Sequence, residues 1–184
     1  MLLSGSDTPA VILTWALSLL LNNPNVLKKA QQELDILTSK DGKVEEINTR
    51  DLVYLQAIIK ETLRLYPPLP VIPPHESTED CEVSGYYIPA GTRLLIYVNY
   101  KIQRVSQVWS DTDDFRPERF LTSHKEVNVK GQHFQLISFS SGRRMCPAAS
   151  FALQVLQLTL GNLLQHLSSQ PLLMNRLILG RQLG

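Results

Sequence analysis

The sequence predicts a mainly α-helical fold with a small β region, in one domain of ordinary size. Apolar residues recur at helical spacing through the first third of the 184 residues and again near the end. From Cys81 the runs become short and rich in β-forming residues, and glycine and proline break them. A content of 43% hydrophobic and 19% charged residues is close to the average for globular domains.

Three helices are expected in the first third of the chain. The first covers "AVILTWALSLLL", residues 10–21, which is apolar on nearly all sides and is interpreted as a buried helix that stops at Asn22. Pro24 is well placed to begin the second helix, because proline suits a first helical turn. The third begins near Asp51 and ends before "YPPLPVIPP", where the prolines exclude a helix. The apolar stripe of the second helix is Leu27, Ala30, Leu34 and Leu37, and "SKDGK" behind it is a loop.

The rest of the chain is expected to contain a small sheet, a long loop and a last helix. The run "CEVSGYYIPAGTRLLIYV" is interrupted by Gly85 and Gly91, which indicates short strands with tight turns, and Cys81 is interpreted as a loop residue next to a strand. Residues 106–137 show little periodicity, and a loop of this length is uncommon in a compact domain unless it is functional. Residues 147–167 are apolar at helical spacing.

Charge, cysteine content and hydropathy exclude several classes of protein. Eighteen Lys plus Arg against seventeen Asp plus Glu leave a net charge of +1, which argues against a nucleic-acid partner. Two cysteines without a CxxC pair indicate neither a disulfide framework nor a zinc knuckle. The segment 10–21 spans only about 18 Å, too short for a bilayer, and it lacks the basic flank and cleavage site of a signal peptide. We therefore expect no transmembrane segment or signal peptide.

Cys146 is the residue whose surroundings point to chemistry. It follows a glycine and two arginines in "FSSGRRMC" and precedes Pro147, which suits the first turn of the helix expected there. A cysteine just before a helix faces free amides and the positive end of the helix dipole, and both favour a thiolate. Gly142 lets the backbone approach a flat group closely, and Arg144 offers a fork of donors to carboxylates. The alternative is a buried structural cysteine in a turn.

The segment "FSSGRRMC" resembles the haem-binding loop of the cytochrome P450 family, with Phe139, Gly142, Arg144 and Cys146 at the matching positions. Three further motifs occur in the family's order. "KETLR" is similar to its Glu-x-x-Arg helix, "FRPERF" to the segment whose arginine pairs with that helix, and "SGSDT" to its oxygen-activating helix. The runs around residues 88–104 and 117–134 look most like plant members that oxidise specialised metabolites. The resemblance covers roughly residues 2–167.

The resemblance implies a cofactor and partners. Cys146 would be the axial ligand of the iron of haem b, in a loop that also contains Phe139 and Gly142. Arg144 would bind a haem propionate, and His75 would bind one too unless it is a solvated loop histidine. Electrons would come from NADPH through a cytochrome P450 reductase, and the substrate would be small and lipophilic. A full-length relative would lie on the cytosolic face of the endoplasmic reticulum membrane, held by an N-terminal anchor that this sequence lacks.

Glu61, Arg64 and Arg119 would form a structural network that holds the Cys146 loop rigid. Glu61 and Arg64 are three residues apart, so they are neighbours on one face of a helix, and alone they would be an ordinary solvated pair. The apolar residues around them, together with Arg119 as a third partner, favour a buried network instead.

Asp7 and Thr8 are the expected catalytic residues, and the sequence allows two interpretations of them, a catalytic role and a helix-capping role. In the family reading they relay protons to dioxygen at the haem, in a helix that bulges at Gly5. In the other reading Asp7 or Thr8 caps a helix that has Pro9 at its first position. A proline in a continuous helix would clash with the carbonyl of Gly5.

We interpret residues 1–184 as a partial cytochrome P450 domain, the C-terminal part of that fold, with an atypical C-terminus over residues 168–184. The order would be the oxygen-activating helix, the Glu-x-x-Arg helix, the small β region, the long loop, the haem-cysteine loop and a last helix. The expected function is that of a haem-thiolate monooxygenase of plant secondary metabolism. A truncated remnant with little or no haem binding, and a helical interaction module, are the two alternatives.

Overall fold

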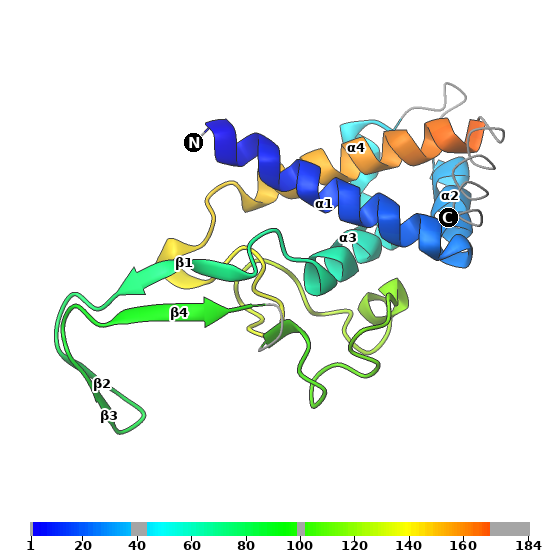
Figure 1. Ribbon diagram of the computed structural model, residues 1–184. Helices are drawn as coiled ribbons and strands as arrows, with labels where there is room; N and C mark the ends of the chain where they lie inside the picture. The colour runs from blue at the N-terminus through cyan, green and yellow to red at the C-terminus, as the bar shows by residue number, and fades with distance from the viewer. Residues whose placement is uncertain (1, 38–43, 99–101, 170–184) are drawn as a thin grey trace, which may run out of the picture.

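The computed structural model describes residues 2–37, 44–98 and 102–169. In these residues four α-helices pack together, and a pair of strands extends away from them with a smaller hairpin at its tip (Figure 1). The mainly helical fold with a small β region is therefore confirmed. The loop expected at "SKDGK" and residues 170–184 of the expected atypical end lie outside the described residues.

Helix α1 (Leu2–Asn22) is continuous and contains Pro9. The prediction that Asp7 or Thr8 caps a helix beginning at Pro9 is therefore wrong. Proline cannot donate a hydrogen bond to the carbonyl of Gly5. The helix nevertheless runs through this position, and its later turns pack firmly through Ile12 and other residues of one face.

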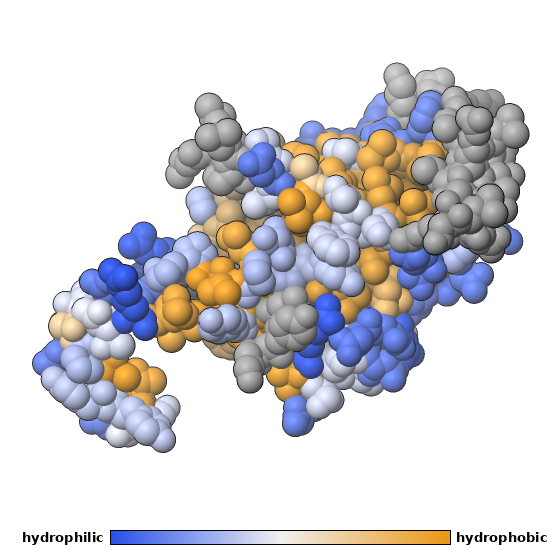
Figure 2. Space-filling model, in the orientation of Figure 1, coloured by the Kyte–Doolittle hydropathy of each residue, from blue (hydrophilic) through white to orange (hydrophobic). Residues whose placement is uncertain are grey.

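Burial of α1 is one-sided, which corrects the expectation of a helix buried all round. Ile12, Ala16 and Leu20 form a fully buried stripe, as residues four apart must on one helix face. Val11 and Trp15 are 42% and 40% exposed. Apolar residues gather over the helical part of the molecule in the space-filling view (Figure 2).

Helix α2 (Pro24–Leu37) begins at the expected proline, and α3 (Val53–Leu65) follows a short 3-10 helix, η1 (Glu46–Arg50). The expected stripe of α2 is buried up to Leu34, whereas Leu37 is 37% exposed. Glu33 links the two helices, because its carboxylate accepts the free amides of Tyr54 and Leu55 at 2.7 and 2.9 Å. These are the amides that the first turn of α3 leaves without partners, so α2 supplies the N-terminal cap of α3.

The β region begins earlier in the chain than the sequence indicated, at Val71 and not at Cys81. Strand β1 (Val71–Glu76) pairs antiparallel with β4 (Arg93–Tyr97), and β2 (Cys81–Val83) pairs with β3 (Tyr86–Ile88). The two prolines of "VIPPHE" argue against a strand, so the sequence did not indicate β1. They lie where the pairing register shifts between Ile72 and His75, and a missing amide hydrogen is tolerated at such an irregularity. His75 is thus a strand residue, and Cys81 lies in β2 and not in a loop.

Residues 106–137 are the expected long, mostly irregular segment, which contains the 3-10 helix η3 (Pro117–Phe120). It is anchored by buried side chains, among them Trp109, Val127 and Leu136. Lys60 on α3 donates to the carbonyl of Val127 at 2.9 Å, and burial lowers the pKa of Lys60. Helix α4 (Ala149–Ser169) begins two residues later than Pro147 and buries Leu156, Leu160 and Leu164.

Candidate functional site

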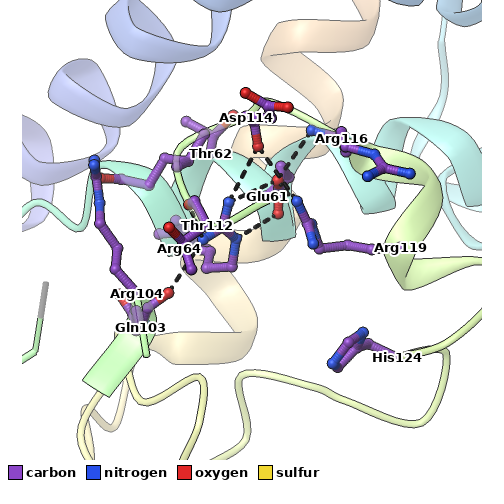
Figure 3. A network of polar contacts seen from close by, with 12 residues as sticks. Glu61, Thr62, Arg64, Gln103, Arg104, Thr112, Asp114, Arg116, Arg119 and His124 are labelled. Carbon is purple, nitrogen blue, oxygen red and sulfur yellow. Dashed lines mark hydrogen bonds and ion pairs between the residues drawn. The ribbon is translucent and has the colours of Figure 1, made fainter. Parts of the chain in front are cut away.

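Glu61 lies buried between two arginines from different parts of the chain (Figure 3). Its carboxylate accepts the Nε of Arg64 at 2.8 Å and the Nη2 at 2.9 Å, a bidentate pair within α3. The Nε of Arg119, on η3, reaches the same carboxylate at 3.0 Å. The three side chains are 0%, 0% and 4% exposed, so this is no solvated i,i+3 pair.

The remaining guanidinium donors bind main-chain carbonyls of the irregular segment. Arg64 donates to the carbonyls of Gln103 and Thr112 at 3.1 and 2.7 Å, and Arg119 donates to that of Ser110 at 2.7 Å. Both arginines also reach the carbonyl of Asp114. Since an irregular segment must satisfy its buried carbonyls somewhere, the two arginines fix the course of residues 103–114.

Trp109 and His124 also belong to this cluster, although no sequence pattern predicted it. The Trp109 ring lies 5.3 Å from the guanidinium carbon of Arg64 and 6.0 Å from that of Arg119, within the range of cation–π contacts. His124 stacks on Trp109 with ring centroids 4.5 Å apart. No spacing in the sequence links these residues, because they meet through long-range packing.

The loop that carries Cys146 is held by its own backbone. The amide of Cys146 donates to the carbonyl of Phe139 at 2.9 Å, which closes the loop, and the amide of Met145 donates to that of Gly142 at 3.1 Å. Ser140 and Gly142 have positive φ angles of 66° and 67°. Gly142 begins the short helix η4 (Gly142–Arg144), and a Cβ atom placed there would meet nothing within 4 Å. The backbone at Gly142 is therefore open to a flat group.

Gly131 supports the other side of this loop. Its φ is +75°, and an added Cβ would lie 3.0 Å from the sulfur of Met145 and 3.1 Å from the carbonyl oxygen of Ser140. A side chain at residue 131 would therefore both strain its own backbone and push the Cys146 loop.

We expect Gly131→Ala to lower the free energy of unfolding by about 1–3 kcal/mol, because backbone strain and a steric contact add. Gly85→Ala is the matched control: its φ is +83° but nothing lies within 4 Å of the new Cβ. The midpoints of urea unfolding give both values. Equal losses for the two variants would show that contact with the loop contributes nothing.

The other predicted site residues lie on separate elements. Cys146 is half-buried between η4 and α4, and Arg144 is exposed. Asp7 is exposed and Thr8 half-buried on α1, while His75 is half-buried on β1. The N-terminal ends of α1 and α4 both lie at the end of the helical part from which β1 and β4 extend (Figure 1).

In residues 2–37, 44–98 and 102–169, no group of three His, Cys, Asp or Glu residues could hold a metal ion by itself. Within the same ranges no single helix is long and apolar enough to cross a membrane, although α1 from Gly5 and α2, bent by 111°, reach that length and composition together.

Comparison with known proteins identifies the family. The model of the cytochrome P450 family matches residues 1–179, and the chain belongs to this family. It is 58% identical over 161 residues to a flavonoid-6-hydroxylase of Ocimum basilicum and 56% identical over 165 residues to xanthotoxin 5-hydroxylase of Arabidopsis thaliana. It is also 57% identical over 163 residues to demethylepipodophyllotoxin synthase of Sinopodophyllum hexandrum.

These matches confirm the resemblance to plant members of specialised metabolism. They cover 88–89% of this chain but only 30–31% of each relative. The chain thus spans about a third of the length of the curated relatives it matches.

Proposed function

We propose that residues 1–184 form the haem-binding C-terminal portion of a monooxygenase that inserts one oxygen atom from O2 into a small lipophilic plant metabolite. The observation that carries this proposal is the closed Cys146 loop, held by the hydrogen bond from its amide to Phe139 at 2.9 Å. The relatives named hydroxylases support the reaction class. The substrate would be a small lipophilic metabolite of the broad kind that the names of these relatives indicate.

The residues of the loop fit a haem. Cys146 offers one thiol, which suits the axial position of an iron whose other ligands come from a porphyrin. The open backbone at Gly142 leaves room for the flat ring, and Phe139 packs against the main hydrophobic core behind it. Arg144 is exposed, so its guanidinium is free to turn toward a propionate, and His75 would bind one from β1.

When bound, the haem would supply dioxygen chemistry driven by two electrons from NADPH through a reductase. The chain's own residues would prepare the site. The Cys146 thiolate would hold the iron and push electron density onto it. Asp7, which is exposed, and Thr8, which is half-buried, lie in the first turns of α1 and would hold and pass on the protons that the reaction consumes. The Glu61–Arg64–Arg119 cluster would act only on the shape of the loop.

The partners follow from the same proposal. A cytochrome P450 reductase would deliver electrons one at a time, and the lipophilic substrate would bind mainly to parts of the fold that precede these residues. The cytosolic face of the endoplasmic reticulum membrane is the expected location of a full-length protein.

The experiment compares the chain alone with a chimera in which residues 1–184 replace the matching C-terminal part of the basil flavonoid-6-hydroxylase. Both receive haem, NADPH and a plant reductase, and oxygenated product is measured over a panel of lipophilic substrates. We expect NADPH-dependent product from the chimera and none from the chain alone, because the relatives are about three times longer and a haem must be buried on both faces.

Each alternative gives a different result. A chimera that binds haem but forms no product would identify the segment as a remnant that catalyses nothing. If neither protein gave a Soret band with haem, the helical interaction module would be the better description. Product from the chain alone that disappears in Cys146→Ala would show that the segment is a minimal enzyme.

A further inference from the structure

Gln103 joins the buried arginine cluster to the segment that enters the Cys146 loop. Its side chain is fully buried, and its main-chain carbonyl accepts the Nη1 of Arg64 at 3.1 Å (Figure 3). Its main-chain N–H donates to the carbonyl of Val98 at 2.9 Å, so both main-chain polar groups of Gln103 are held. Its side-chain Nε2 donates to the Oγ of Ser138 at 2.7 Å, 35 residues further along the chain.

Ser138 continues this connection to the cysteine. Its hydroxyl accepts from Gln103 and donates to the carbonyl of Leu63 on α3 at 3.2 Å. Ser138 directly precedes Phe139, whose carbonyl accepts the amide of Cys146 at 2.9 Å. The hydroxyl of Ser138 is thus held from two sides, and the next residue carries the bond that closes the loop.

We propose that Gln103 and Ser138 are positioning residues for Cys146. They transmit the rigidity of the Glu61–Arg64 pair to the start of the loop, so that the Phe139 carbonyl stays in place for the Cys146 amide. The inference that this positions an iron ligand rests on the proposed function. The bridge itself is a property of the polypeptide and can be tested without haem.

A buried side chain that bridges two segments fixes them only while the hydrogen bonds that form the bridge are kept. Replacing Ser138 by alanine would leave the Nε2 of the fully buried Gln103 without its acceptor, and a buried donor without a partner carries a desolvation penalty. The start of the loop would then open locally, before the helices do, because its closing bonds are few.

The first test is amide hydrogen exchange, read by mass spectrometry on peptides from α3 and from residues 139–146. In Gln103→Leu, which removes the hydrogen bond from Gln103 to Ser138, we expect exchange of the loop peptide to become about tenfold faster while that of α3 is unchanged. Ser138→Ala also removes the bond from Ser138 to the carbonyl of Leu63, so its loop peptide should exchange at least as fast. Ser138→Thr keeps the hydroxyl and should restore the slow exchange.

Thr62→Val is the matched control. The Thr62 hydroxyl is fully buried on the same helix and donates to the carbonyl of Ile58 at 2.8 Å, but it is not part of the bridge. The proposal would be overturned if Ser138→Ala, like the control, accelerated exchange of α3 and of the loop together. Ser138 would then stabilise the fold in general and would not position the loop. The double variant should open the loop no more than Ser138→Ala alone, because Ser138→Ala already removes the bond that Gln103→Leu removes.

The second test uses the chimera with haem, reduced and saturated with carbon monoxide. We expect Ser138→Ala to lower the thiolate-ligated fraction severalfold and Thr62→Val to leave it unchanged. An unchanged fraction in Ser138→Ala would overturn the positioning role. Failure of the proposed function looks different: the unsubstituted chimera would then lack the thiolate-ligated spectrum, while the effect on loop exchange would persist.

Discussion

Cys146→His abolishes the thiolate-ligated spectrum of the ferrous carbon monoxide complex in the chimera, if Cys146 is the iron's ligand. Histidine can still bind iron, but through a neutral nitrogen that pushes far less electron density than a thiolate. We therefore expect haem to remain bound in part and the rate of product formation to fall at least a hundredfold. Difference spectroscopy measures the first effect and product formation the second.

Cys81→Ser is the control, because Cys81 is exposed on β2 and belongs to no part of the proposed site. That variant should keep both the spectrum and the rate. If Cys146→His kept the thiolate spectrum, the ligand would be another residue and the proposed role of the loop would be wrong.

Glu61→Ala should have the second large effect, on stability and haem loading together. It leaves two buried guanidinium groups facing each other without a counter-charge, and removing one partner of a buried ion pair costs about 3–5 kcal/mol. That is a large part of the stability of an ordinary domain. We expect loss of soluble expression of the chimera and loss of haem incorporation, measured as the ratio of haem to protein.

Two further variants make this result specific. Glu61→Gln keeps an acceptor oxygen and the shape of the side chain, so it should lose less than Glu61→Ala. Glu126→Ala removes an exposed carboxylate that lies 3.9 Å from Lys125, and it should change stability by about 0.5 kcal/mol or less. Normal haem loading in Glu61→Ala would mean that the carbonyl contacts of the arginines suffice without the carboxylate.

The helices were predictable because their signals are local. The start of α2 at Pro24 follows from the fixed φ of proline, and the stripe through Leu34 follows from helical periodicity. The same local rules failed where packing outweighs them. At Pro9 the rule predicts a helix start, yet α1 continues through it. At Pro73 and Pro74 the rule correctly excludes a helix, but it does not indicate the strand that pairing with β4 makes around an irregular register.

Part of the candidate site was present in the sequence, because motif spacing places Glu61 and Arg64 on one helix face and Cys146 ahead of a helix. Spacing could not decide whether the Glu61 pair is solvated or buried. Burial depends on Arg119, which lies 58 residues away from Glu61, and on the carbonyls of an irregular segment.

The sequence by itself determined most of the helices and the order of the motifs, and it carries the proposal that Cys146 binds iron, since each depends on residues a few positions apart. Only the tertiary structure decided which polar groups are buried together. The bridge from Gln103 to Ser138 and the stacking of His124 on Trp109 carry no local signal. Both contacts form because folding removes these side chains from water and the packing brings distant segments close enough for them to meet.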